Sequence, residues 1–406
     1  MIKGNMLIGQ SGGPTAVINS SLAGAVSEGM VNPYIEKIYG AINGVSGVLT
    51  ENFYDFSKDT QEDLELLKLT PGAALGSVRY SLADFTSLDD VSYDYHRLLE
   101  VFKKYNIRYF YYIGGNDSMD TCNKIAKYLK LVKYEAYVIG IPKTIDNDLP
   151  VTDHTPGYGS AIKYVATTLS QIYLDVNSYR KGRVTVVEIM GRDAGWLAAG
   201  AKLSCLNGTA PDLIYLPECG LDVEEFLKDV SRIFEEKKKV LVAVGEGIKT
   251  KEGEYLLKYS HLSKADSFGH LQLGGVGQVL CEIVGDRLGL PVRAIELNLP
   301  QRCASHILSK ADVDEAFEVG RHAVIYSTQG LTNKMVIMIR DNGQITYDVT
   351  DIQNVAKLVK CVPLEFINEK QNNITDKYLE YAMPLIQGEI QLPFENGLPK
   401  IYRLKK

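Results

Sequence analysis

Two acidic loops lie close together in the sequence, each directly after an apolar run. The first covers residues 114–118 (Gly-Gly-Asn-Asp-Ser) and the second covers residues 142–148 (Pro-Lys-Thr-Ile-Asp-Asn-Asp). They contribute the carboxylates Asp117, Asp146 and Asp148 and the ammonium group of Lys143. One site could use all four groups. Carboxylates bind a hard cation such as Mg²⁺, whereas a lysine and the amino end of a helix bind phosphate. This combination of groups predicts phosphoryl transfer.

Both loops follow predicted buried strands. Residues 107–113 form a nearly unbroken apolar and aromatic run, and residues 136–141 form a second one, as strands buried on both faces require. Apolar residues recur at helical spacing between 119 and 129. In a right-handed parallel unit of this kind, both loops lie beyond the carboxyl ends of their strands, at one edge of the sheet.

Strand–glycine loop–helix units recur along the chain. We expect further strands at 5–8, 183–190 and 239–244, and helices at about 16–28, 160–176, 196–203 and up to 287. This alternation predicts an α/β fold with two doubly wound, Rossmann-like lobes, whose mostly parallel sheets face one cleft. The runs 335–339 and 344–348 flank Asp-Asn-Gly, which predicts a C-terminal antiparallel hairpin, followed by a helical extension.

A lobe boundary is expected near residue 157, where Thr-Pro-Gly-Tyr-Gly interrupts the alternation. The first lobe, which would hold the phosphoryl donor, is predicted to comprise residues 1–157, with 272–325 returning to it. The second lobe, which would hold the acceptor, is predicted to comprise residues 158–271 together with 326–406.

Composition indicates an ordinary globular protein and argues against a general binder of nucleic acid or membrane. The chain has 406 residues, of which 45% are hydrophobic and 23% charged, and a formal net charge of −6. No apolar run approaches the roughly 20 residues of a membrane span, and the amino terminus lacks a signal-peptide pattern. The six cysteines are scattered, which favours reduced thiols and a cytoplasmic location.

The loops 114–118 and 143–148, together with Met190-Gly191-Arg192, resemble the signature loops of phosphofructokinases. Supporting matches are Gly12-Gly13, Gly-Ser-Val-Arg at 76–79 and Gly-His-Leu-Gln at 269–272. Together they span residues 5–300 in the family's order, and that order is far more specific than any single glycine loop. The resemblance implies Mg²⁺-dependent phosphorylation of the 1-hydroxyl of fructose 6-phosphate.

The donor implied by the resemblance is pyrophosphate. ATP-using members usually have glycine where Lys143 and Asp117 stand. The lysine would extend a cation to a terminal phosphate, and the carboxylate would intrude where the α-phosphate of ATP must lie. With pyrophosphate as the donor, the reaction would run in both directions.

The resemblance assigns the general base to Asp146, which would take the hydroxyl proton, and Asp148 would support it if the loop stayed extended. Lys143 and Thr144 complete the expected catalytic set. The expected donor-binding residues are Gly12, Gly13, Arg79, Gly115, Asn116 and Lys143. Asp117 is the expected Mg²⁺ ligand, since the neutral amide of Asn116 binds the ion more weakly.

The expected acceptor-binding residues of the same chain are Thr144, Asp146, Asp148, Met190, Gly191, Arg192, Glu246 and His270. Arg183 and Lys264 match positions that relatives contribute from a neighbouring subunit, so a homodimer or homotetramer is expected. Leu273 stands where many members carry an arginine for the sugar phosphate, and Tyr402 or Arg403 is expected to replace it.

Three other interpretations stay open. The protein could be an ATP-dependent phosphofructokinase, a pyrophosphate-dependent kinase of another sugar phosphate such as sedoheptulose 7-phosphate, or a non-catalytic regulatory subunit. Taken alone, the Asp-Asn-Asp sequence at 146–148 is also compatible with a simple Asx turn.

Overall fold

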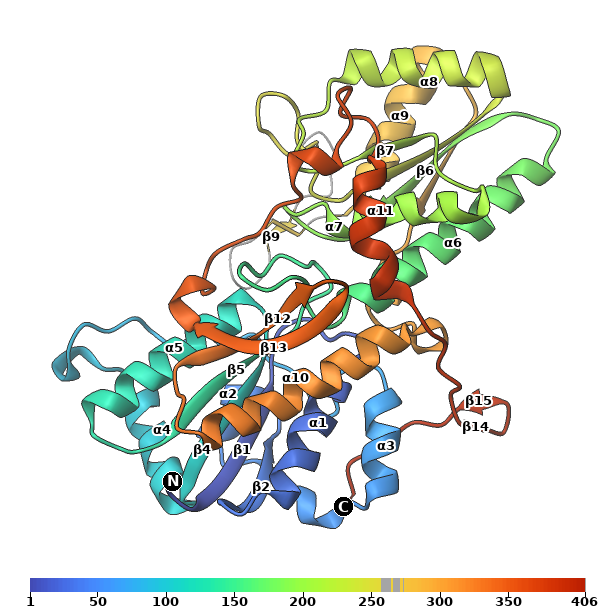
Figure 1. The fold of residues 1–406 in the computed structure, drawn as a ribbon. Helices are drawn as coiled ribbons and strands as arrows, with labels where there is room; N and C mark the ends of the chain where they lie inside the picture. Colours follow the sequence, from blue (N-terminus) through green and yellow to red (C-terminus); the bar gives the residue numbers. More distant parts are fainter. Residues whose placement is uncertain (257–263, 266–270, 273, 406) are drawn as a thin grey trace.

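The first lobe, which is the lower one in Figure 1, is built on a seven-stranded sheet of order β13-β12-β5-β4-β1-β2-β3. The computed structural model describes residues 1–256, 264–265, 271–272 and 274–405. Strands β1, β2, β4, β5 and β12 are parallel, and β3 and β13 are antiparallel at the two edges. The strands are β1 (Gly4–Gln10), β2 (Ile35–Ala41), β3 (Phe53–Asp55), β4 (Ile107–Gly114), β5 (Tyr137–Pro142), β12 (Lys334–Asp341) and β13 (Gln344–Asp351).

Helices cover both faces of this sheet, which explains the unbroken apolar runs of its central strands. In β4, Tyr109, Tyr111 and Ile113 belong to the core on one face, and Phe110 and Tyr112 belong to the core on the other. Helices α1 (Ile18–Val31), α3 (Gln61–Leu69) and α10 (Lys310–Thr328) cover the first face. Helices α2 (Gly44–Leu49), α4 (Tyr93–Lys104) and α5 (Asn116–Leu131) cover the second.

The second lobe has a four-stranded, fully parallel sheet of order β11-β6-β8-β7. Its strands are β6 (Arg183–Ile189), β7 (Leu213–Tyr215), β8 (Lys239–Gly245) and β11 (Val292–Glu296). Helices α6 (Tyr158–Ser178), α7 (Trp196–Ala199) and α11 (Asp376–Ala382) pack on one face, and α8 (Val223–Lys237) and α9 (Val276–Leu288) on the other. Two short antiparallel pairs complete the described strands: β9 (Lys264–Ala265) with β10 (Leu271–Gln272), and β14 (Phe394–Glu395) with β15 (Leu398–Pro399).

The expected α/β class with two mostly parallel sheets is confirmed, but the chain divides between the lobes differently from the prediction. Strand β11 pairs with β6 and α9 packs in the second-lobe core, so residues 276–296 do not return to the first lobe. Strand β12 pairs with β5, so the hairpin at 334–351 extends the first sheet and not the second. A hairpin signal predicts that two strands pair with each other, but it carries no information about which sheet edge receives them.

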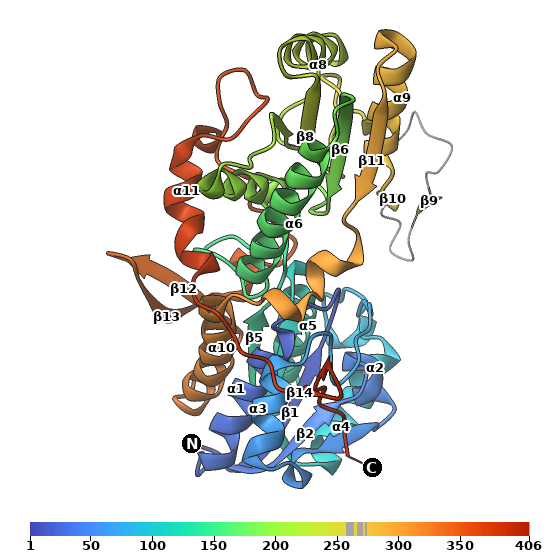
Figure 2. The same ribbon diagram turned by 90° about the vertical axis from the view of Figure 1, so that its right-hand side faces the viewer.

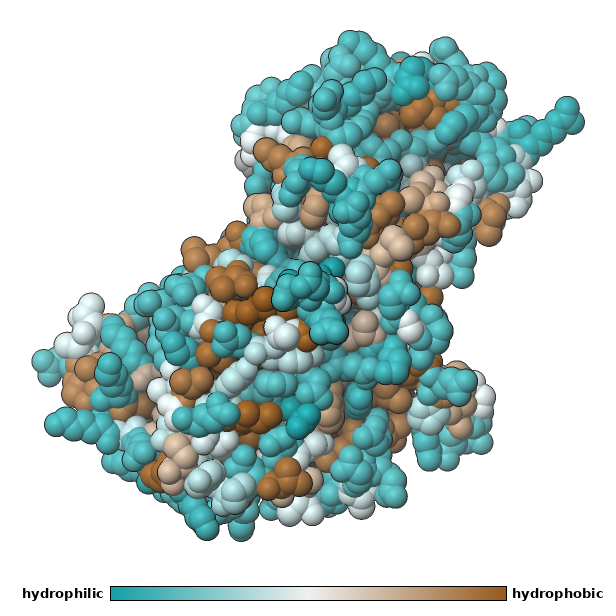
Figure 3. Space-filling model, viewed as in Figure 1, coloured by the Kyte–Doolittle hydropathy of each residue, from teal (hydrophilic) through white to brown (hydrophobic). Residues whose placement is uncertain are grey.

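The two lobes are connected at several points. Figure 2 shows α6 and the segment between β11 and α10 running through the junction between the lobes. Figure 3 shows apolar surface gathered near this junction, whereas the outer face of α8 is mostly hydrophilic. Among the helices that the structure describes, each is too short or too polar to span a bilayer.

Helices α1 and α10 cross at very close range, at two glycines. A Cβ atom at Gly24 would lie 2.0 Å from the carbonyl oxygen of Phe317, and one at Gly320 would lie 2.0 Å from that of Ser21. Only a residue without a side chain permits this approach of the two backbones.

We therefore expect Gly24→Ala to lower the free energy of unfolding by roughly 2–3 kcal/mol, because the added methyl group forces the helices apart. The matched control is Gly285→Ala inside α9, where the nearest atom to a Cβ lies 4.0 Å away. That change should be neutral or stabilise by about 0.5–1 kcal/mol through its helix propensity. Equal effects of both substitutions in urea unfolding would contradict this account of the crossing.

Candidate active site

The two acidic loops meet at the carboxyl edge of the first sheet. Strands β4 and β5 are parallel neighbours in which Gly114 is opposite Pro142, and the Lys143 amide donates to the Gly114 carbonyl at 3.1 Å. Asn116 Nδ2 lies 3.5 Å from Asp148 Oδ2. The structure thus brings the two loops together as the parallel pairing predicts.

The side chain of Lys143 is buried against the first glycine loop. Its Nζ donates to the Gly13 carbonyl at 2.8 Å, and a Cβ at Gly12 would lie 3.3 Å from the same Nζ. Burial lowers the pKa of Lys143 to about 8, although the Asp146 and Asp148 carboxylates oppose this effect. The glycines therefore make room for a cation at the end of β1.

The segment from Thr144 to Asp148 is a turn and not an extended loop. The Asp146 amide donates to Thr144 Oγ1 at 3.1 Å, and Asn147 has a φ of 52°, in the left-handed region that asparagine tolerates. Asn147 Nδ2 also donates to the hydroxyl of Tyr381 at 2.8 Å. The condition under which Asp148 was expected to support Asp146, an extended loop, is not met.

The two carboxylates nevertheless interact. Burial raises the pKa of Asp146, while the positive charges of Arg192, Lys143 and Arg302 oppose the rise. Burial, followed by the charge of Asp146, raises the pKa of Asp148 to about 7. Burial therefore favours the neutral form of both carboxylates, and the three cations oppose this effect at Asp146.

The second lobe faces this pair with the loop that follows β6. Glu246, directly after β8, accepts the amides of Gly191 and Arg192 at 3.2 and 3.0 Å through Oε1. Burial raises the pKa of Glu246 to about 7, and the charge of Asp146 adds to the rise. The charge of Asp146 acts on Glu246, so these two carboxylates, one from each lobe, lie within electrostatic range of each other.

Sequence reasoning missed Arg302, which ends the short 3₁₀ segment Leu299–Arg302 between β11 and α10. A Cβ at Gly13 would lie 2.9 Å from Arg302 Nη1, and the charge of Arg302 acts on both Lys143 and Asp146. Its neighbour Gln301 accepts the Met190 amide at 3.2 Å. The available signal was a strand, Val292–Glu296, followed by a polar loop, the same pattern that marks the other loops of the site.

The remaining donor residues lie around the same edge. Ser77 Oγ donates to the Gly12 carbonyl at 2.5 Å, which holds residues 76–79 against the glycine loop, and the charge of Arg79 acts on Lys143. Asp117 is exposed in the first turn of α5. Gly115 lies directly before that helix, and a Cβ there would lie 3.7 Å from the Lys143 carbonyl oxygen.

Several predicted residues do not reach this cleft in their own chain. Tyr402 is buried in the first lobe, where its hydroxyl donates to Asp59 Oδ2 at 2.9 Å, and Arg403 follows it on the surface. The expectation that Tyr402 or Arg403 replaces the phosphate-binding arginine is therefore not met, because the chain end packs on the Tyr54 and Asp59 side of the sheet.

Arg183 also lies apart from the cleft loops. Arg183 begins β6, whose other end leads into the cleft, so about 20 Å of strand separates it from the Gly191 loop. Lys264 belongs to the short strand β9. His270 and Leu273 lie outside the described residues.

The family model for phosphofructokinase matches residues 5–297. The chain belongs to the phosphofructokinase family. It is 38% identical over 413 residues to the pyrophosphate–fructose 6-phosphate 1-phosphotransferase of Halomonas elongata, covering 100% of this chain and 97% of the relative. It is 33% identical to the sulfofructose kinase of Alkalicoccus urumqiensis, covering 95% of each chain. The crystal structure of a pyrophosphate-dependent phosphofructokinase from Nitrosospira multiformis superimposes with a TM-score of 0.89 at 36% identity, covering 99% of this chain and 97% of that one.

The donor set of this phosphofructokinase fits Mg²⁺ that is shared with a phosphate substrate. Within the described part of the chain, no three His, Cys, Asp or Glu side chains converge on one point. A single exposed carboxylate, Asp117, is compatible with Mg²⁺, which keeps several waters and takes one or two carboxylates together with substrate oxygens.

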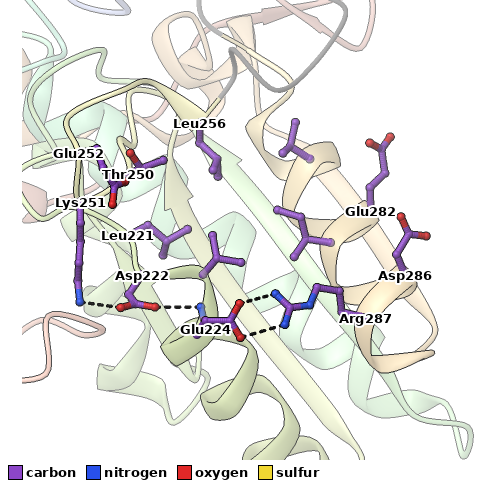
Figure 4. A pocket seen from close by; sticks show the side chains of 13 residues that line it. Leu221, Asp222, Glu224, Thr250, Lys251, Glu252, Leu256, Glu282, Asp286 and Arg287 are labelled. Carbon is purple, nitrogen blue, oxygen red and sulfur yellow. Dashed lines mark hydrogen bonds and ion pairs between the residues drawn. The ribbon is translucent and has the colours of Figure 1, made fainter.

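A separate hollow of about 570 Å³ lies on the second lobe of the phosphofructokinase fold, between α8 and α9 (Figure 4). Arg287 donates to both carboxylate oxygens of Glu224, and Lys251 pairs with Asp222 at 2.7 Å. None of the cleft residues described above lines this hollow.

The pKa of Asp148 generates a prediction about stability. A carboxyl group whose pKa is raised by folding binds its proton more tightly in the folded state, so stability falls as the pH rises from about 4 to above 7. Asp148→Asn should therefore stabilise the unliganded protein at pH 8, by on the order of 2 kcal/mol, and much less at pH 5.

Urea unfolding at both pH values measures this difference. Asp117→Asn, at an exposed position of the neighbouring loop, is the control and should show no comparable gap. An increase in the free energy of unfolding for Asp148→Asn that is the same at pH 5 and pH 8 would contradict the assignment of a buried, ionisable Asp148.

Proposed function

We propose that this protein transfers a phosphoryl group from pyrophosphate to the 1-hydroxyl of fructose 6-phosphate, giving fructose 1,6-bisphosphate and orthophosphate. The observation that carries the proposal is the buried ammonium group of Lys143 against the Gly12-Gly13 loop. A cation at that depth suits a short, highly charged donor. The names of the relatives from Halomonas and Nitrosospira support the same donor.

Asp146 is the proposed general base. The 1-hydroxyl oxygen of the sugar bonds to the phosphorus atom, the bond from phosphorus to the bridging oxygen breaks, and the hydroxyl proton passes to the Asp146 carboxylate. A base must be ionised before the reaction, and Arg192, Lys143 and Arg302 favour the ionised form of Asp146. The pKa of Asp148 is raised to about 7, so we assign it the role of the supporting carboxylate of the pair.

The positive groups around the cleft offset the charge of the transferring phosphoryl group. Lys143 and Arg302 reach it from two different elements, and Arg79 stands on the loop held by Ser77. Their guanidinium and ammonium groups are fixed before the reaction, so little reorganisation is needed in the transition state. Asp117 would hold Mg²⁺, which neutralises phosphate charge when it is bound.

The acceptor would lie between Asp146 and the second lobe. The amides of Met190, Gly191 and Arg192 donate to Gln301 and Glu246, which shapes this loop. The loop would offer the Arg192 guanidinium to the acceptor, and Glu246 would offer its other carboxylate oxygen, Oε2, to sugar hydroxyls. Thr144 supports the turn that carries the base. His270 is a further proposed contact to the sugar.

We propose that a neighbouring subunit supplies further positive charge to the sugar phosphate. Arg183 lines a hollow of about 220 Å³ at the amino end of β6 together with Lys181 and Arg293. This cluster is separated from its own cleft by the length of β6, so we propose that it serves another chain. Lys264 is a second proposed contributor to the homo-oligomeric site.

A second acceptor is favoured by one comparison. The relative from Alkalicoccus is called a sulfofructose kinase and matches nearly the whole chain. A sulfonate and a phosphate present similar oxygens to arginine, so 6-deoxy-6-sulfofructose is the alternative acceptor to compare with fructose 6-phosphate.

The test is an initial-rate assay with Mg²⁺ that compares pyrophosphate and ATP at matched concentrations, each with both acceptors. We expect turnover with pyrophosphate and fructose 6-phosphate, at least 100-fold faster than with ATP. Faster turnover with ATP would overturn the proposed donor, and faster turnover with the sulfonated sugar would overturn the proposed acceptor.

Two substitutions separate catalysis from binding. Asp146→Ser should lower kcat by about 10²–10⁴-fold with little change in KM, because a base acts in the transition state. Arg302→Met should raise the KM of the phosphate substrates by about 10-fold or more, because it removes a charged phosphate contact. Unchanged kcat in the first variant, or an unchanged KM in the second, would remove that residue from its assigned role.

A further inference from the structure

Residues 355–362, here called the strap, run from the first lobe to the second past the acidic loops. The strap follows β13, and Val355 is still part of the first-lobe core. Val362 packs in the core of the second lobe, and its amide donates to Glu218 Oε1 at 2.9 Å. Between these ends the side chains of Leu358 and Val359 are about half exposed. The strap is therefore anchored at both ends but has little apolar packing in its middle.

Lys360 is the point at which the strap contacts the acidic loop. Its backbone amide donates to the Asp148 carbonyl at 2.7 Å. Its Nζ donates to the carbonyl oxygens of Thr152 and Asp153 at 3.1 and 3.0 Å. Lys360 thus forms hydrogen bonds to both ends of the segment 148–153.

The same residue reaches the second lobe through Trp196. The Lys360 carbonyl accepts the indole Nε1–H of Trp196 at 2.8 Å, and the Lys360 ammonium lies 5.2 Å from the centre of the indole ring. Trp196 begins α7, directly after the Met190–Arg192 loop and its turn. Lys360 therefore contacts the loop that carries Asp148 in the first lobe and α7, the helix that follows the Met190–Arg192 loop, in the second.

The charge of Lys360 is poorly solvated. Burial lowers the pKa of Lys360 to about 8, and the charges of Asp153 and Asp148 oppose this effect. The charged groups that act on Asp148 come from its own turn, Asp146 and Lys143, and from the strap, Lys360. The amide of Asn116 also donates to Asp148, and the same Nδ2 donates to the strap at the Leu358 carbonyl.

We propose that Lys360 is a positioning residue of the phosphoryl-transfer site, which fixes the turn carrying Asp146 and Asp148 and lends Asp148 a positive charge. The proposal rests on the function assigned above to that pair of carboxylates. Lys360 touches no reacting atom. It acts through the backbone of the loop and through its charge.

The test compares Lys360→Met, which keeps the length of the side chain and removes its charge and hydrogen bonds, with Lys360→Arg, which keeps both. The control is Lys357→Met, because Lys357 is an exposed strap lysine whose Nζ lies 3.6 Å from Asp120. Each variant is assayed for kcat, for both KM values and for the pH dependence of kcat/KM. Fluorescence of Trp196, the one tryptophan of the chain, reports whether the strap stays in contact with α7.

We expect Lys360→Met to lower kcat by about 10–100-fold with both KM values within about threefold of wild type, because the base is misplaced. Removal of the positive charge should also move the acid limb of the pH profile upward by about half a pH unit or more. Lys360→Arg should restore most of kcat, and Lys357→Met should match wild type. An equal loss of kcat/KM at all pH values that arginine does not rescue would contradict the proposal and leave Lys360 a structural role. Wild-type kinetics of Lys360→Met would also overturn the proposal.

A second measurement separates this proposal from the proposed reaction. Lys360→Met should steepen the loss of stability between pH 5 and pH 7.5 in urea unfolding, because Asp148 then ionises without the positive charge of Lys360. This measurement needs no substrate. An unchanged slope would overturn the charge role of Lys360 even if the enzyme proved to use another donor or acceptor.

Discussion

The proposed reaction depends on one electrostatic constraint: the carboxylate that accepts the proton has to be ionised at a site where burial favours its neutral form. Burial raises the pKa of Asp146, and cations from three separate elements oppose the rise: Lys143 from its own turn, Arg302 from the 3₁₀ segment after β11, and Arg192 from the loop after β6. Lys143 in turn needs a counter-charge, since burial lowers its pKa and the Asp146 and Asp148 carboxylates oppose that effect. The charges of Lys143 and Asp146 therefore support each other.

This mutual dependence explains the architecture around the cleft. Parallel sheets place their loops at one edge, so two such sheets facing each other bring charged loops into one volume without any long loop. The glycine loop at Gly12-Gly13 makes room for both Lys143 and Arg302, because a side chain at either position would meet one of them. The segments that cross the junction, α6 and the stretch between β11 and α10, connect the lobes that carry these loops.

Much of this arrangement could be predicted from the sequence because it depends on local patterns. Buried strands followed by glycine and carboxylate residues predicted the β4–α5–β5 unit, the meeting of its loops and the loop after β6. The position of Arg302 could not be found in this way, because Arg302 lies in none of the signature loops and its approach to Gly13 is set by tertiary packing. The assignment of Tyr402 failed for a related reason: a residue near the chain end has no local pattern that states which lobe it covers, and here its hydroxyl is used by Asp59. The turn at Asn147 likewise depends on Tyr381, which is more than 200 positions away in the sequence.

The pairing of β12 with β5 has a consequence for the order of folding. As the chain is synthesised, β5 remains an unpaired sheet edge until residues 334–341 emerge, although its other neighbour, β4, is already in place. Strands β6, β7, β8 and β11 of the second sheet are all made before that point, within one continuous stretch of the chain. The inserted lobe can thus acquire its sheet while the lobe that precedes it still has an open edge, and closing that edge requires a contact between distant parts of the chain. Nascent chains that stop between the two sheets would be the form of this protein most exposed to aggregation.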